Sequence, residues 1–124
     1  MLEREGPGWR FAKDFSKTPF CVLIGGEGWA FELREKEWEV LCRLVQELTE
    51  HHHQLIDQLM NEESISIEKE ISPWWGCLDG DKSTWCLQII LEGKGAFARG
   101  VEGYWPAPAA QEIASIMRTT WDSH

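Results

Sequence analysis

The sequence predicts an α+β fold of two antiparallel sheets, a long helix and a short C-terminal helix, in one domain spanning residues 1–124. Short segments alternate apolar and polar residues, as half-buried strands do. One stretch between them changes to a helical period. Eight tryptophans, most of them in the strand-like segments, predict an aromatic core, because each buried indole removes ~150–250 Å² from water.

The first half predicts three strands in a meander. Residues 8–14 place Trp9 and Phe11 on one side of a strand. Residues 19–24 are apolar on both faces, which favours a central strand. A glycine-rich turn follows, because glycine adopts positive φ without a steric penalty, and residues 29–34 alternate again.

A long helix is predicted from about Arg34 to Asn61, with a heptad seam along it. The seam residues are Trp38, Leu41, Val45, Leu48, His52, Leu55 and Leu59. Such a helix would be ~40 Å long, whereas a compact domain of this size is only ~35 Å across. Either the helix spans the whole domain or its far end pairs with a second copy, and the second reading predicts a homodimer through the seam. With His52 at that interface, the dimer would weaken as pH falls.

The second half predicts four strands, at residues 64–71, 73–78, 84–91 and 96–105, with a hairpin turn at 79–82. Pro106 and Pro108 end the last strand and begin a helix, whose apolar face carries Ile113, Ile116, Met117 and Trp121. The order of three strands, helix, four strands, helix indicates a pseudo-repeat, with halves at about 8–61 and 64–122.

The segments PFCVLIGGEGWAFEL, HHHQLIDQLM, PWWGCLDG and RGVEGYWPAPAA resemble an uncharacterised cyanobacterial family, domain of unknown function 1818, over nearly the whole chain. That family is similar to the single-stranded-DNA-binding transcriptional regulator fold, whose better-known branch is the plant Whirly proteins. The resemblance implies two curved sheets with helices crossing between them, often assembled through those helices. In place of the lysine-rich, KGKAAL-like strand that Whirly proteins use on DNA, LEGKGAFARG has Lys94 and Arg99 without that pattern.

The net charge is −9, and residues 27–70 hold twelve acidic but only four basic residues. The excess therefore lies mainly on the predicted long helix and its flanks, where Glu35 and Glu39 are found. A solvated face that aids solubility is one explanation, and a docking surface for a basic protein is the other. The sequence therefore favours a non-catalytic protein-interaction or regulatory module.

Two other functions remain open. Single-stranded nucleic acid binding combines stacking aromatic residues with a positive groove; the candidates are Arg10, Lys13, Trp74, Trp75 and Arg99. Because Trp74 and Trp75 are adjacent, they must point to opposite faces of their strand. Small-ligand binding in a tryptophan-lined cleft between the sheets is the third possibility.

Catalytic and metal-binding motifs are not found, so we expect neither an enzyme nor a cofactor. Histidine occurs only at 51–53 and 124, and no serine or cysteine is predicted to lie near a histidine base. Three successive helical histidines point ~100° apart and cannot converge on one metal ion. His53 and Asp57 would supply only two ligands.

The chain is expected to be cytoplasmic. The first residues do not have the pattern of a secretory signal, and no apolar run approaches membrane-spanning length. Its four cysteines, Cys21, Cys42, Cys77 and Cys86, are predicted to be reduced core residues, with a single disulfide as the alternative.

Overall fold

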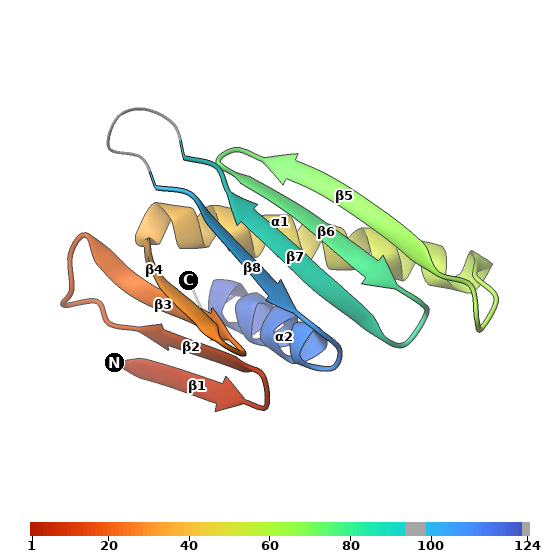
Figure 1. Cartoon of the computed structure of the whole chain (residues 1–124), viewed down its shortest axis with the longest axis horizontal. Helices are drawn as coiled ribbons and strands as arrows, with labels where there is room; N and C mark the ends of the chain where they lie inside the picture. Colours follow the sequence, from red (N-terminus) through yellow and green to blue (C-terminus); the bar gives the residue numbers. More distant parts are fainter. Residues whose placement is uncertain (94–98, 123–124) are drawn as a thin grey trace.

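The computed structural model describes residues 1–93 and 99–122, with side chains to residue 120. It contains two four-stranded antiparallel sheets and two helices (Figure 1). The first sheet consists of β1 (Leu2–Gly6), β2 (Trp9–Lys13), β3 (Phe20–Gly26) and β4 (Trp29–Arg34). The second consists of β5 (Ile65–Ile71), β6 (Trp74–Gly80), β7 (Trp85–Leu91) and β8 (Val101–Trp105). This confirms the predicted α+β class.

The first half has four strands rather than the three that were predicted, because β1 precedes the meander and pairs with β2. The β1–β2 and β3–β4 turns are alike, since Gly8 and Gly28 both adopt φ near +80°. That value suits the third position of a type II turn, which only glycine occupies easily. In both hairpins a glycine two residues earlier pairs with the tryptophan that follows the turn, Gly6 with Trp9 and Gly26 with Trp29.

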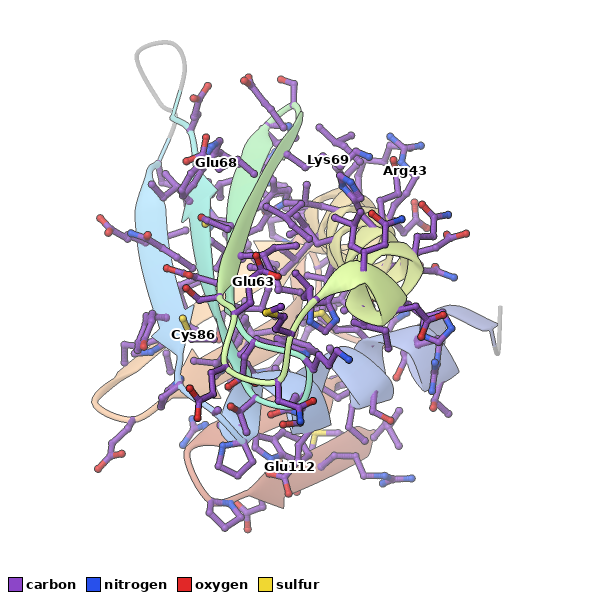
Figure 2. All side chains as sticks on the ribbon, turned by 90° about the vertical axis from the view of Figure 1, so that its right-hand side faces the viewer. Arg43, Glu63, Glu68, Lys69, Cys86 and Glu112 are labelled. Atoms are coloured by element: carbon purple, nitrogen blue, oxygen red, sulfur yellow. The ribbon has the colours of Figure 1, made fainter. Side chains whose placement is uncertain are left out.

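The long helix α1 (Glu35–Leu55) ends earlier than predicted and is followed by a short 3₁₀ turn, η1 (Ile56–Gln58). Its 21 residues span ~32 Å, which matches the width of the domain. The C-terminal helix α2 (Ala109–Asp122) begins directly after Pro108, as predicted. Both helices lie on one side of the second sheet, as Figure 2 shows.

The heptad seam packs inside its own chain, which corrects its assignment to a dimer interface. Five seam side chains are 0–6% exposed: Trp38, Leu41, Val45, Leu48 and His52. Leu55 is partly buried against the same core, and Leu59 lies beyond the helix and is also partly buried. Because glycine has no side chain, Gly76 allows Leu44 and Leu48 to pack closely against β6. A Cβ at position 76 would lie 3.0–3.1 Å from both leucines.

His52 fixes α1 to the β6–β7 hairpin rather than to another subunit. Its Nε2 lies 2.8 Å from the carbonyl oxygen of Asp81, and its ring is tilted by 56° against that of Trp85, with the ring centroids 6.0 Å apart. The Asp81 side chain in turn accepts hydrogen bonds from the backbone amides of Ser83 and Thr84. The basis for a pH-dependent dimer at His52 is thereby removed.

The first turn of α1 joins three segments of the chain. Glu37 accepts a hydrogen bond from the backbone amide of Arg34 at 2.8 Å, which caps the helix. The same carboxylate pairs with the guanidinium of Arg99. The carbonyl oxygen of Glu37 accepts a hydrogen bond from the indole of Trp74 at 2.9 Å.

Tryptophans also join the two sheets. The indole N–H of Trp105 donates to the carbonyl oxygen of Gly25 at 3.0 Å, and that of Trp29 donates to the carbonyl oxygen of Tyr104 at 3.1 Å. Among the seven tryptophan side chains that the structure describes, four are buried: Trp9, Trp38, Trp74 and Trp105. The predicted aromatic core is therefore present, while the side chain of Trp121 lies outside the described residues.

Candidate interaction surface

The five residues proposed for nucleic acid do not share a surface. Arg10 is exposed on the outer face of the first sheet, whereas Lys13 on the same strand is 1% exposed on the inner face. Trp74 is fully buried, and Trp75 lies on the outer face of the second sheet. Arg99 is held by Glu37. The basic candidates Arg10, Lys13 and Arg99 therefore do not line one groove, and Lys94 lies outside the described residues.

Three cavities have volumes of about 590, 310 and 140 Å³. The largest lies on the outer face of the first sheet, around Ala12 and Leu23, and its rim carries charges of both signs, including Glu3, Arg10 and Glu32. Among the described residues that line the three, the sole tryptophan is Trp85, in the smallest cavity. The structure therefore does not form the expected tryptophan-lined cleft in any of the three.

The outer face of the second sheet has a uniform charge. Its outward residues, which we call the acidic sheet face, alternate with the buried ones along β5–β8: Ser66, Glu68, Glu70, Trp75, Cys77, Asp79, Cys86, Gln88, Ile90, Glu102 and Tyr104. Four of these are carboxylates, and none of the described residues on this face is lysine or arginine. Figure 2 shows that Glu68 and Lys69 point to opposite sides of β5, with Lys69 directed toward the helix that carries Arg43.

Strand register places two of the carboxylates on either side of an apolar centre. Glu70 pairs with Trp75, Trp75 with Ile90, and Ile90 with Glu102. These four residues form one row across all four strands, which we call the Glu70–Glu102 row. Because neighbouring strands lie ~4.8 Å apart, its two carboxylates are ~14 Å apart at the backbone. Trp75 and Ile90 are both partly exposed.

The next row toward the β6–β7 hairpin consists of Glu68, Cys77, Gln88 and Tyr104 and is uncharged at its centre, and the row beyond it holds Ser66, Asp79 and Cys86. Gln88 donates to Glu102 at 2.9 Å. Cys77 lies 3.4 Å from the hydroxyl of Ser66, and Cys86 donates to the carbonyl oxygen of Asp79. Tyr104 is 50% exposed, and its hydrogen bond with Cys86 raises the pKa of the phenol above its ordinary value.

The four cysteines are free thiols, but only Cys42 is a buried core residue as predicted. Burial raises the pKa of the Cys42 thiol well above its ordinary value. Cys21, Cys77 and Cys86 are partly exposed. Within residues 1–93 and 99–122, no cluster of three or more histidine, cysteine or carboxylate side chains is arranged to hold a metal ion. Nor does this part of the chain contain a helix long and apolar enough to cross a bilayer.

The acidic sheet face could not be found from the sequence by charge counting alone. Glu68 and Glu70 belong to the acidic segment 27–70, but Asp79 and Glu102 are distant in the chain. Strand alternation indicates which residues share a face of one strand. The register between strands, which no local pattern sets, is what brings the four carboxylates together.

Comparisons with known proteins agree with the fold. A crystal structure of a protein with unknown function, described as from the DUF155 family and from Prochlorococcus sp. NATL2A, is 43% identical, has a TM-score of 0.92, and matches 98% of this chain and 99% of that one. No curated protein matches the chain. The family described as "Domain of unknown function (DUF1818)" matches residues 4–120. The chain therefore belongs to the DUF1818 family.

Proposed function

We propose that the protein is a non-catalytic interaction module that docks a basic protein segment on the acidic sheet face. The observation that carries this proposal is the Glu70–Glu102 row, in which two carboxylates flank Trp75 and Ile90. An apolar centre with a charged rim is the usual anatomy of an interface. Because none of the described residues of this face is lysine or arginine, its carboxylates favour a partner of positive charge.

The row also specifies a spacing for the partner. An extended chain advances ~3.3 Å per residue and turns every second side chain to the same face. Two cations four residues apart therefore lie ~13 Å apart, close to the ~14 Å between the backbones of Glu70 and Glu102. The residue midway between the cations faces Trp75 and Ile90, so an apolar side chain fits there. The expected partner motif is cation–x–apolar–x–cation.

The exposed side of α1 fits a basic partner less well. Glu39 already lies 3.9 Å from Lys36 on the same helix, and Arg43 pairs with Glu47 at 4.0 Å. Exposed charges of both signs alternate there, which is typical of a solvated helix face. The acidic sheet face therefore suits a basic partner better than the surface of α1 that carries Glu35 and Glu39.

NMR mapping with a synthetic peptide tests the proposal. A peptide that repeats Lys-Ser-Leu-Ser should shift the backbone amide signals of β5–β8 and leave those of β1–β4 in place. A peptide that repeats Glu-Ser-Leu-Ser has the wrong charge and should shift neither. A peptide that repeats Lys-Leu-Ser-Ser keeps the composition but places leucine on the other face, so it should bind more weakly. Equal shifts for both lysine peptides, or shifts centred on α1, would contradict the proposal.

The proposal also includes a Whirly-like arrangement and a cytoplasmic setting. It includes a homodimer as well, formed through surfaces other than the heptad seam. The order of four strands and a helix, repeated twice, supports the first. Four free thiols support the second, because disulfides are common where proteins are oxidised. Single-stranded nucleic acid is not favoured, because its five candidate residues are dispersed. Sedimentation equilibrium would measure the oligomeric state.

A further inference from the structure

A small polar cavity of about 140 Å³ lies between α1, the start of β7 and α2. An apolar cavity of ~150 Å³ is large enough for benzene, so this one has room for a ligand of about six non-hydrogen atoms. Five of its nine described lining residues are polar or charged: Gln46, Thr49, Gln111, Ser115 and Arg118. Because the burial of polar groups without hydrogen bonds is unfavourable, this lining favours a polar ligand.

Gln111 has a buried acceptor that needs a donor. Its Nε2 donates to the carbonyl oxygen of Ser83 at 2.6 Å. This bond fixes the orientation of the amide, because the opposite orientation would place two oxygens against each other. The remaining Oε1 is buried and accepts no hydrogen bond from the residues that the structure describes. A buried acceptor without a donor is destabilising, so a ligand that supplies the donor gains affinity at this atom.

Arg118 gives the cavity a positive charge. It lies two helical turns after Gln111 on the same side of α2, because residues seven positions apart align on a helix. Its side chain is exposed, and it forms no ion pair with a carboxylate of the described residues. No described residue in the lining is acidic. A carboxylate is therefore the expected partner, because it can accept two parallel hydrogen bonds from a guanidinium.

We propose that this cavity binds a short hydroxycarboxylate, which the available volume limits to about two to four carbons. The carboxylate pairs with the guanidinium of Arg118, the hydroxyl donates to Oε1 of Gln111, and the carbon chain lies against Trp85. A hydroxyl suits Gln111 better than an ammonium does. The described lining offers no carboxylate to an ammonium, and burial of an unpaired charge is unfavourable. This site is independent of the acidic sheet face, because the helices lie on the opposite side of the second sheet.

Four three-carbon probes test this inference by NMR titration. 3-Hydroxypropionate should bind and shift amide signals of α1, the start of β7 and α2. Propionate lacks the hydroxyl and should bind at least about fivefold more weakly, because Gln111 stays unpaired. 3-Aminopropionate should be weakened to a similar extent, and 1,3-propanediol, which lacks the carboxylate, about two- to fivefold. No binding of 3-hydroxypropionate, an equal affinity for any other probe, or shifts centred on the first sheet would overturn the proposal.

Two variants test the two ends of the ligand separately. Arg118→Met should weaken 3-hydroxypropionate binding about two- to fivefold, the range for an exposed ion pair, and leave 1,3-propanediol binding unchanged. Gln111→Met should make 3-hydroxypropionate bind no better than propionate. Arg4→Met is the matched control for charge, because Arg4 is an exposed arginine on the first sheet. An equal loss in Arg4→Met and Arg118→Met, or a preference for the hydroxyl that survives in Gln111→Met, would refute the inference.

Discussion

Replacing Gly103 with alanine should destabilise the junction between the two sheets. Gly103 lies on β8 directly beneath the indole of Trp29 from β4. A Cβ at position 103 would lie 2.6 Å from Cη2 of Trp29 and 3.0 Å from two further ring carbons. These distances are shorter than van der Waals contact, so the indole must move.

The indole has little freedom to move. Its ring stacks on Phe31 at 5.2 Å and meets Trp105 at 5.1 Å, and its N–H donates to Tyr104 at 3.1 Å. Overpacking costs ~1–3 kcal/mol, and loss of the hydrogen bond costs a further ~0.5–1.5 kcal/mol. Removal of a strand glycine returns ~0.5–1 kcal/mol. The expected net loss is therefore ~0.5–4 kcal/mol, or ~2–15 °C in Tm for a chain of this length.

Urea unfolding followed by tryptophan fluorescence and circular dichroism would measure the loss. Gly100→Ala is the matched control, because its Cβ would meet Leu91 only at an ordinary 3.4 Å; it should change stability by less than ~0.5 kcal/mol. In a Trp29→Phe background the smaller ring leaves room for the methyl group, so Gly103→Ala should cost much less. A Gly103→Ala variant as stable as the wild type, or an equal loss in the Trp29→Phe background, would refute the steric account.

Three further predictions concern buried hydrogen bonds and titration. Trp105→Phe removes the donor to the Gly25 carbonyl and should destabilise by ~1–3 kcal/mol in urea unfolding, because a buried acceptor loses its partner; unchanged stability would contradict this. His52→Ala should lower the free energy of unfolding, measured in urea, by ~2–3 kcal/mol, because the contact with the Asp81 carbonyl oxygen is lost. The sedimentation profile of the wild-type protein should stay constant between pH 5.5 and 8. Hydrogen bonds from Thr84 and Ser83 lower the pKa of Asp81; the stability that this carboxylate provides is therefore present above its unfolded pKa and lost as pH falls below about 4. Asp81→Asn should flatten that acid limb, and an unchanged pH profile would contradict the assignment.

The helix shows both what residue periodicity predicts and what it leaves out. The seam residues Trp38, Leu41, Val45 and Leu48 were identified as an apolar face, and they are buried. Periodicity indicates which side chains leave water but not which surface covers them. The helix also ends at Leu55, so its ~32 Å no longer require a partner beyond the domain.

The missed first strand has a physical explanation. LEREG is an edge strand whose middle residues, Glu3, Arg4 and Glu5, are exposed, so it lacks the alternation that marks a half-buried strand. A usable signal was the repeat of Gly-Pro-Gly-Trp at residues 6–9 and Gly-Glu-Gly-Trp at 26–29, because both turns join paired strands. The second turn was recognised, and its copy near the N-terminus implies the strand before it.

The candidate site depended on information that local patterns do not contain. Adjacent residues such as Trp74 and Trp75 were correctly assigned to opposite faces, but the sequence did not specify which face was outside. Lys13 was expected on an accessible face and is instead buried. Which face of a short strand is buried depends on the layer that packs against the strand. Here that layer comes from both helices.

The dissociation constants of the Lys-Ser-Leu-Ser peptide for two charge-reversed variants test the docking proposal most directly. Glu68→Lys/Glu70→Lys and Glu35→Lys/Glu39→Lys change the net charge equally, but the first alters the acidic sheet face and the second alters α1. We expect the peptide to bind the first variant about tenfold more weakly than the wild type. The second variant should bind it as the wild type does, apart from a small effect of net charge that both variants share. Equal losses in both would show that net charge alone attracts the peptide and would contradict a docking site on the second sheet.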